Sequence, residues 1–211
     1  LTLDGTHVIY PYKQTAGETS LISPEALAKK YPYALAYFEK VRAVLDLRDG
    51  GAAAGSEWYR YIRTQNIGLQ LLPKIAVPRL VNKLKAAPDF NGEVCLDNVD
   101  VGGILVDDAS GISNLTLLGL LNSSVLNFYF LKIAAPYRGG YYSANRQFIE
   151  PLPIVVPQKC DIHTFDDYVA TCQEANRIIA NSVSDQSSRD PLMLAYFEQI
   201  LNGMVYELYF P

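Results

Sequence analysis

The chain has 211 residues, of which 49% are hydrophobic and 19% charged, and its formal net charge is −4 at pH 7. This composition is typical of one well-buried globular domain, or of a domain with an appended subdomain. The acidic balance argues against a general nucleic-acid coat protein, so any DNA or RNA role must rest on local clusters of cations. Residues 1–150 hold 15 Lys and Arg against 14 Asp and Glu, while residues 151–211 hold 3 against 8. The acidity therefore belongs to the C-terminal part.

Cysteine usage and the start of the chain bear on its location. Cys95, Cys160 and Cys172 are an odd number of cysteines without C-x-x-C spacing, and the N-terminus lacks a basic-then-apolar signal segment. We therefore expect a reducing cytoplasm. The chain begins abruptly at Leu1, which we do not expect to be a native start.

The first 55 residues predict a short strand and two helices. Residues 7–12 read as a strand ended by proline, and Ser23-Pro24-Glu25 has the cap, proline and acid that begin a helix. A second helix is predicted from Pro32 to Gly50-Gly51, with one apolar face formed by Leu35, Phe38, Val41 and Leu45.

The only tryptophan, Trp58, opens a stretch that ends at Pro88 and contains no acidic residue. Its six cations are Arg60, Arg63, Lys74, Arg79, Lys83 and Lys85. Cations interleaved with aromatic rings are typical of a nucleic-acid surface. The alternative is that Trp58, Tyr59 and Ile62 belong to the core and the cations are merely solvated. A second patch, Tyr137 to Arg146, carries Arg138 beside a Gly-Gly turn and favours a polyanion-binding cleft.

Short β-like runs follow at residues 74–77, 94–96 and 103–106 and predict a small, mostly antiparallel sheet. Residues 112–131 carry no charge, but their Ser, Thr and Asn side chains would be costly in a membrane. They therefore predict a buried helix, begun by Ser113 or Asn114, rather than a membrane span.

Pro151, Pro153 and Pro157 predict an extended linker and hence a division into residues 1–157 and 158–211. Beyond the linker, a capping box at residues 164–167 and the pair Asp190-Pro191 each predict the start of an amphipathic helix. The fold class is thus α+β, with packed helices on the sheet and a C-terminal antiparallel helical hairpin.

Catalytic signals are poor. There is no glycine-rich cofactor motif, Walker loop or G-x-S-x-G sequence. Asp107 and Asp108 could share a metal ion in a small hydrolase, but adjacent acids more often form a solvated turn, and no third ligand is evident. We expect neither a catalytic site nor a metal site in this chain.

A series of short motifs follows in a fixed order along nearly the whole chain. They are Tyr10-Pro11-Tyr12, Glu57-Trp58-Tyr59-Arg60 with Arg63-Thr64-Gln65, Lys74-Ile75-Ala76-Val77-Pro78, Leu120-Leu121-Asn122-Ser123, Arg138-Gly139-Gly140-Tyr141, Ile149-Glu150-Pro151-Leu152-Pro153-Ile154 and Val205-Tyr206-Glu207-Leu208-Tyr209. This ordered series resembles the C-terminal target-recognition region of TaqI-like adenine-N6 DNA methyltransferases and fused type IIG restriction-modification enzymes.

The resemblance implies sequence-specific recognition of double-stranded DNA in a bacterial or archaeal cytoplasm. In the family, a methyltransferase domain on the N-terminal side binds S-adenosylmethionine and flips the target adenine. This sequence has no Asn/Asp-Pro-Pro-Tyr motif and no Pro-Pro pair. We therefore expect a C-terminal piece without a cofactor of its own, whose partners are DNA and the methyltransferase domain of the same polypeptide, with no membrane partner.

The family's recurrent residues, such as Trp58, Asn122 and Pro151, are expected to be scaffold, with Asn122-Ser123 a buried polar pair. Base contacts are predicted for Arg63, Gln65 and Arg146, and phosphate contacts for the lysines. The predicted DNA-binding residues are Arg60, Arg63, Gln65, Lys74, Arg79, Lys83 and Lys85 on one wall, with Arg138, Tyr141, Tyr142 and Arg146 on the other. The alternative function is a protein-interaction module that works through the acidic helical hairpin at its C-terminus.

Overall fold

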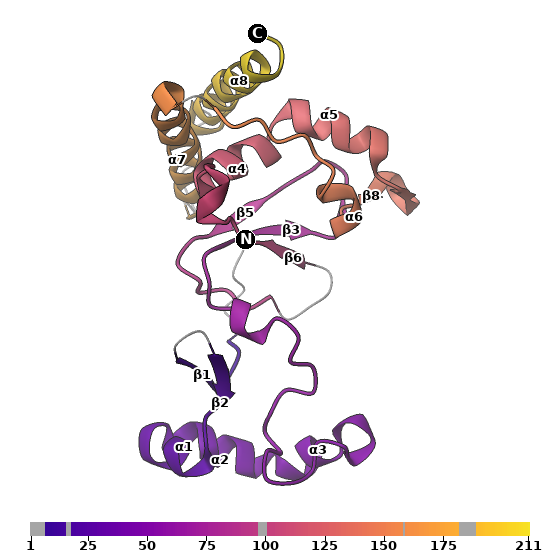
Figure 1. Cartoon of the computed structure of the whole chain (residues 1–211), viewed down its shortest axis with the longest axis vertical. Coiled ribbons are helices and arrows are strands. Elements are labelled where there is room, and N and C mark those ends of the chain that lie inside the picture. The colour runs from indigo at the N-terminus through magenta and orange to yellow at the C-terminus, as the bar shows by residue number, and fades with distance from the viewer. Residues whose placement is uncertain (1–6, 16–17, 97–100, 158, 182–188) are drawn as a thin grey trace. The chain divides into compact units, whose positions relative to one another are not determined.

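The computed structural model describes residues 7–15, 18–96, 101–157, 159–181 and 189–211. The chain divides into two compact units, residues 2–72 and residues 73–211, which we call the N-terminal and C-terminal units (Figure 1). The sequence predicts a division after residue 157 instead, a position that lies inside the C-terminal unit.

The N-terminal unit combines a two-stranded sheet with short helices. In the sheet, Tyr12 is paired with Leu21 and Thr15 with Glu18. The elements are β1 (Tyr12–Thr15), β2 (Glu18–Leu21), α1 (Pro24–Lys30), α2 (Pro32–Lys40), α3 (Arg42–Asp46) and the 3-10 turns η1 (Arg48–Gly51) and η2 (Ile67–Leu69). The strand predicted at residues 7–12 is wrong in position, because only its last residue belongs to β1.

Local signals explain the helices of this unit. The Ser23 hydroxyl accepts a hydrogen bond from the Ala26 N–H at 3.3 Å, and proline follows at the first position of α1, as the sequence predicts. The predicted second helix is interrupted at Val41, which separates α2 from α3. Phe38 nevertheless lies in the core with Leu35 and Leu45 against it, so the predicted apolar face is confirmed for these three residues but not for Val41.

Trp58 is a core residue of the N-terminal unit. It packs edge-on against both Phe38 and Tyr59, and Leu27 completes the buried cluster. The Arg42 guanidinium lies 4.8 Å from the centre of the indole ring, a cation–π contact. The sequence allowed two interpretations of Trp58 and Tyr59, as part of a nucleic-acid surface or as core residues. The second interpretation is confirmed.

The C-terminal unit contains two three-stranded antiparallel sheets. It also contains the longer helices (Figure 1). The first sheet has the order β5 (Ala87–Asp89), β3 (Lys74–Pro78), β6 (Val101–Ile104). The second has the order β4 (Leu80–Val81), β8 (Tyr141–Ser143), β7 (Pro136–Tyr137). The helices are α4 (Asn114–Leu121), α5 (Ser124–Ile133), α6 (Arg146–Ile149), α7 (Lys159–Asn181) and α8 (Arg189–Tyr209), with 3-10 turns η3 (Asp108–Ser110) and η4 (Arg138–Gly140). The strand predicted at 94–96 is wrong, since residues 87–89 pair with β3 in its place.

The single helix predicted for residues 112–131 is two helices, α4 and α5, bent by 63°. Ser113 begins α4 by accepting a hydrogen bond from the Thr116 N–H, and Ser123 begins α5 by accepting one from the Leu126 N–H. A second capping serine therefore makes a second helix start, which breaks the first helix. Among the described residues, no single helix is long and apolar enough to cross a membrane, although the bent pair together has that length and composition.

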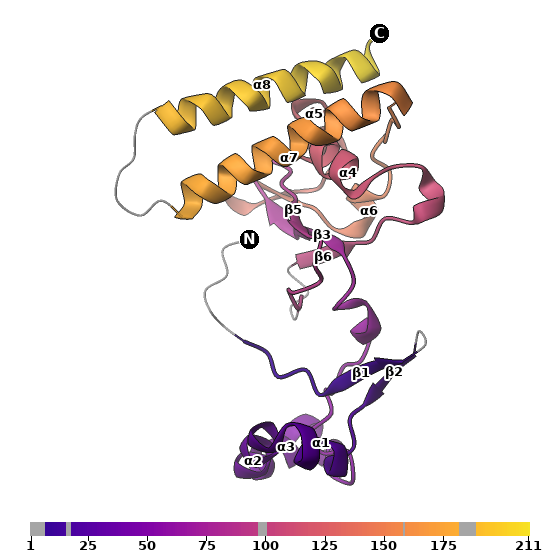
Figure 2. The ribbon, with the colours of Figure 1, turned by 90° about the vertical axis from the view of Figure 1, so that its left-hand side faces the viewer.

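The C-terminal hairpin, α7 and α8, packs on α4 and α5 and shares their core (Figure 2). Asp166 of α7 accepts hydrogen bonds from the Ser113 and Thr116 hydroxyls at 2.7 and 2.6 Å. Asn202 of α8 accepts one from the Ser124 N–H at 2.7 Å. The hairpin thus satisfies polar groups at the N-termini of both α4 and α5, which explains why it belongs to the same unit as the sheets.

Close packing fixes α7 against α4. A Cβ placed on Gly119 would lie 2.5 Å from the Val169 Cγ2 and 2.9 Å from the Phe165 ring, so glycine is required there. The start predicted for this helix at residue 164 is wrong, because α7 begins at Lys159 and Thr164 lies within it. The fold class itself is confirmed: α+β, with antiparallel sheets, packed helices and a C-terminal helical hairpin.

Candidate nucleic-acid interface

The β7–β8 hairpin presents Arg138 at a tight, exposed turn. Tyr137 and Tyr141 are paired across the hairpin, and both rings are about half exposed. Gly139 and Gly140 follow the arginine with φ of 71° and 78°, a backbone conformation that glycine adopts without steric cost. The turn predicted from Arg138-Gly139-Gly140 is therefore confirmed, and it carries an exposed arginine next to a pair of exposed tyrosines.

Strand β4 brings two cations of the first predicted patch beside this hairpin. Val81 is paired with Tyr142 and Leu80 with Ser143, and the Ala144 N–H donates to the Arg79 carbonyl at 2.7 Å. Arg79 and Lys83 flank β4 and are exposed. Residues about 60 positions apart in the sequence thus form one surface, to which each patch contributes at least one cation.

The backbone on either side of Lys85 is fixed by two amide side chains, Asn122 at the end of α4 and Asn127 within α5. Asn127 accepts from the Leu84 N–H at 2.8 Å, while Asn122 accepts from the Ala86 N–H and donates to the Ala86 carbonyl, both at 3.0 Å. Leu84 is buried, and Lys85 is exposed. The prediction of a buried polar pair is correct for Ser123 but wrong for Asn122, which is exposed and fixes the strand-like segment beside it.

Lys74 does not belong to this surface. Only 2% of the residue is exposed, and its ammonium donates a short hydrogen bond to Asp89, which lies directly opposite Lys74 on the neighbouring strand β5. The side chains of Lys74 and Ala76 lie on the face of β3 opposite Ile75 and Val77. The phosphate contact predicted for Lys74 is therefore corrected to a buried ion pair.

The carboxylate of Asp89 has several partners. It also accepts hydrogen bonds from the N–H groups of Glu93 at 2.8 Å and Val94 at 3.1 Å. Burial by itself would raise the pKa of Asp89, but these hydrogen bonds and the bond and charge of Lys74 outweigh it, so that its pKa is lowered. The pair joins β3, β5 and the following loop.

Arg60, Arg63 and Gln65 lie in the other compact unit. Arg63 and Gln65 are exposed, and Arg60 is half-buried. The predicted wall from Arg60 to Lys85 is therefore split: its first three residues belong to the N-terminal unit, and its exposed cations after residue 78 join Arg138 in the C-terminal unit. The sequence could not reveal this division, because it contains no proline-rich or glycine-rich linker near residue 72.

Arg48 is a structural cation that no pattern in the sequence singles out. Its half-buried guanidinium donates to the carbonyls of Leu45, Trp58 and Arg60 at 2.9, 2.8 and 3.0 Å. The bonds to Trp58 and Arg60 hold the segment that leads to Arg63 and Gln65, and the bond to Leu45 ties the same guanidinium to α3. Arg48 thus positions the tryptophan motif.

Arg146 and Tyr142 are less available than Arg138. Arg146 donates to both carboxylate oxygens of Glu150 at 3.2 and 3.3 Å, and the hydrogen bonds and charge of Glu150 raise the pKa of Arg146. Both side chains are exposed, so this pair is easily exchanged for another partner. Tyr142 is half-buried against the core, which favours a structural role, whereas Tyr141 is exposed.

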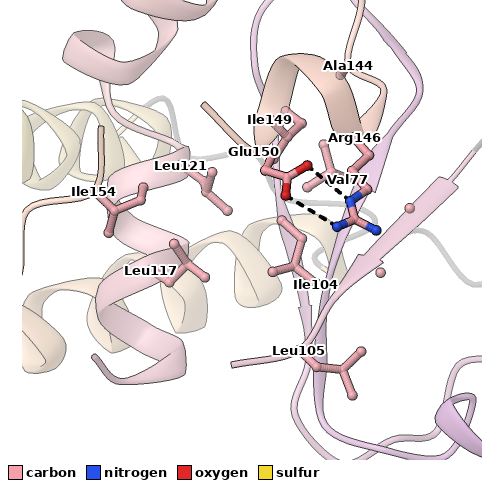
Figure 3. Close-up of a pocket in the computed structure, with 12 residues that line it drawn as sticks. Val77, Ile104, Leu105, Leu117, Leu121, Ala144, Arg146, Ile149, Glu150 and Ile154 are labelled. Carbon is pink, nitrogen blue, oxygen red and sulfur yellow. Dashed lines mark hydrogen bonds and ion pairs between the residues drawn. The ribbon is translucent and has the colours of Figure 1, made fainter. Parts of the chain in front are cut away.

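Arg146 and Glu150 help to line a hollow of about 670 Å³ in the C-terminal unit (Figure 3). The hollow is bordered by β3, β6, α4, α6 and the segments on either side of α6, and most of its lining is apolar. The apolar side chains are Val77, Ile104, Leu105, Leu117, Leu121, Ala144, Ile149 and Ile154. Such a lining does not suit a phosphate, so the hollow is not part of the cationic surface.

Helix α5 adds residues that the sequence did not predict. Phe128 and Tyr129 are exposed, and the Lys132 ammonium lies 5.2 Å from the centre of the Phe128 ring. Only three residues separate Lys132 from β7. The sequence of residues 112–131 predicts one buried, uncharged helix. Only the positions of Phe128 and Tyr129 around α5, counted from the Ser123 cap, could have indicated that these two side chains face outward.

Asp107 and Asp108 lie at an exposed turn. The Asp107 carboxylate accepts a hydrogen bond from the Ala109 N–H at 2.9 Å at the start of η3, and both acids are exposed. In the described part of the chain, no three His, Cys, Asp or Glu side chains are grouped to hold a metal ion. The solvated-turn interpretation fits these aspartates.

These features define a mixed α+β domain, with exposed cations on a tight hairpin and on the segments that flank its neighbouring strand β4. The model of the TaqI-like C-terminal specificity domain matches residues 17–154. Because the match covers more than half of the chain, the chain belongs to this family, as its motif order indicated. The match includes Trp58 and the Arg138 turn and ends before α7. A comparison with curated proteins gives no match.

Proposed function

We propose that this chain is the DNA target-recognition part of an adenine-N6 DNA methyltransferase or type IIG restriction-modification enzyme of a bacterial or archaeal cytoplasm. The observation that carries the proposal is the pairing of β4 with β8, which joins Arg79 and Lys83 to the Arg138 turn in a chain of the specificity-domain family. The methyltransferase domain of the same polypeptide binds S-adenosylmethionine and carries out the methyl transfer.

The residues around the hairpin fit two kinds of contact with double-stranded DNA. Arg138 can donate through its planar fork to guanine O6 and N7, and the tight turn is narrow enough to approach a groove. Arg79, Lys83, Lys85 and Lys132 can neutralise phosphates, which fixes orientation without reading sequence. Arg63 and Gln65 are retained as base-reading candidates of the N-terminal unit.

Binding of the 211-residue chain to a pool of duplexes with randomised sequence tests the proposal. Each phosphate contact contributes about 0.9 to the slope of log K against log salt. Lys83→Ala should therefore lower the slope by roughly one unit with sequence preference unchanged. Lys29→Ala, which removes an exposed cation from α1, is the matched control and should leave the slope unchanged.

Arg138 is tested by a pair of variants. Arg138→Ala should relax selection at one base pair by about 1–3 kcal/mol, and Arg138→Lys should do the same while the salt slope is kept, because lysine retains the charge but not the fork. Salt-independent binding, or unchanged sequence preference in both variants, would contradict the proposed role of the hairpin. Flow-through of the chain on a DNA column at low salt would favour the protein-interaction alternative.

A further inference from the structure

Helix α8 is apolar on two opposite faces. Its inner face, with Leu201 and Val205 buried at the centre, packs in the core shared with α7, α4 and α5. At 3.6 residues per turn, a second set of six positions falls within an arc of about 80° on the opposite side. We call this set the outer stripe; it consists of Leu192, Tyr196, Gln199, Gly203, Tyr206 and Phe210.

The outer stripe is exposed and uncharged. Leu192 is 70% exposed, and the three aromatic residues are exposed by 57% to 61%. The Tyr206 and Phe210 ring centres lie 4.7 Å apart, and the Phe210 N–H donates to the Tyr206 carbonyl, so the stripe continues one residue beyond the end of α8. Exposing four large apolar side chains in a row to water is energetically unfavourable for a monomer.

Gly203 gives a second, independent observation. Glycine in the interior of a helix is destabilising relative to alanine, so it needs a reason. At Gly119 the reason is the close approach of α7, but a Cβ on Gly203 would meet no atom within 4 Å. Within the described part of the chain, nothing uses the small size of Gly203, and it lies in the middle of the outer stripe.

We propose that the outer stripe is the contact of a symmetric dimer in which α8 pairs antiparallel with α8 of a second copy of this chain. In such a two-fold contact, if residue i meets residue j, then j meets i. The stripe satisfies this condition about its centre: Leu192 faces Phe210, Tyr196 faces Tyr206, and Gln199 faces Gly203. Each pair occurs twice, and the glycine leaves room for the longer Gln199 side chain.

Charge agrees with this register. Glu198 and Glu207 lie outside the stripe, and in the antiparallel arrangement their opposite positions are Met204 and Ala195. No two acidic residues of α8 therefore face one another. A parallel arrangement would instead bring each residue against its own copy, including Glu207 against Glu207.

The size of the stripe indicates a weak dimer. Aromatic side chains bury about 150–250 Å² each, so the exposed parts of the three aromatic residues and Leu192 offer roughly 500 Å² per copy. The total of roughly 1,000 Å² is at the lower limit of specific interfaces. We expect a dissociation constant in the micromolar range.

Sedimentation of the 211-residue chain without DNA, from low to several hundred micromolar, tests the dimer independently of the proposed DNA recognition. A monomer–dimer equilibrium is expected. Tyr196→Glu and Tyr206→Lys, made singly, should each weaken association at least about tenfold, because each leaves a charge against a tyrosine. The double variant should recover dimerisation, since the introduced glutamate of one copy then meets the introduced lysine of the other. Tyr33→Glu, at a 91% exposed tyrosine of α2, is the matched control.

Each outcome bears directly on the proposal. A chain that stays monomeric at every concentration overturns it and leaves the stripe to another domain or protein. A dimer that is insensitive to both single substitutions places the contact elsewhere and also overturns it. If the single variants dissociate but the double variant fails to recover while its far-UV circular dichroism is unchanged, the antiparallel register is wrong.

Discussion

The buried pair of Lys74 and Asp89 separates two interpretations of the same lysine. If Lys74 contacts DNA phosphate, its removal should lower the salt dependence of DNA binding and leave the fold intact. If it is the ion-pair partner of Asp89, Lys74→Met leaves a carboxylate that is 6% exposed without its cation. We predict the second result.

The expected magnitude follows from the burial of both groups. Removing one partner of a buried ion pair costs about 3–5 kcal/mol, because the remaining charge cannot be solvated. Against a typical stability of about 5–15 kcal/mol, this is a large fraction of the free energy of unfolding. Asp89→Asn should also destabilise, since it removes the charged partner of the buried Lys74 ammonium. Lys74→Met together with Asp89→Asn should be less destabilising than the sum of the two, by about 1–3 kcal/mol.

Urea unfolding followed by far-UV circular dichroism measures these differences. Trp58 is the only tryptophan and lies in the N-terminal unit, so its fluorescence provides an internal reference for that unit. Hydrogen exchange in peptides that cover β3 and β5 locates the loss. The matched control is Lys83→Met, at an exposed lysine, which should change stability by no more than about 0.5 kcal/mol.

The pH dependence of stability provides a further test of the ion pair, with a defined direction. The pKa of Asp89 is lowered in the folded chain, so its ionised form contributes stability that is fully present above the ordinary value near 3.8. That contribution is lost as the pH falls from this value through the lower folded-state pKa. The stability difference between the natural chain and Asp89→Asn should therefore narrow below about pH 4. Unchanged stability of Lys74→Met, combined with a salt slope lower by about one unit, would refute the ion-pair argument.

The remaining predictions concern packing. Gly119→Ala should destabilise the C-terminal unit by about 1–3 kcal/mol, because the new methyl group overlaps Val169 and Phe165. Gly203→Ala, measured on the monomer, should instead stabilise it by up to about 1 kcal/mol, and equal effects of the two changes in urea unfolding would contradict the packing of α7 on α4. Trp58→Ala should cost the N-terminal unit about 3–5 kcal/mol; if thermal unfolding shows no loss of stability, Trp58 is not the anchor of that unit.

Features governed by sequence neighbours could be predicted well. Ser23-Pro24 begins a helix because the serine oxygen and the proline φ act within one turn, and Gly139-Gly140 permits a turn that other residues resist. The break between α4 and α5 could have been predicted in the same way if Ser123 had been recognised as a helix cap within the apolar run. This cap was missed because the surrounding composition favours a continuous helix.

Candidate DNA contacts could be predicted by residue type but not by exposure. The acid-free stretch contains Lys74 and Lys83, which are alike in sequence context, yet one is buried and the other exposed. The difference arises because β3 is the central strand of its sheet and the register sets Lys74 opposite Asp89. Strand order and register depend on residues far apart in the chain, which local patterns do not specify.

By itself, the sequence determined the family, the mixture of helices and strands, the C-terminal hairpin and the turn that carries Arg138. Only the tertiary structure decided that the chain divides into compact units after residue 72, and that Arg79 and Lys83 accompany Arg138 while Lys74 does not. The physical reason is the range of the interactions involved. Caps, turns and amphipathic faces are set within a few residues, whereas the exposure of a charged side chain is set by which distant segments pack over it.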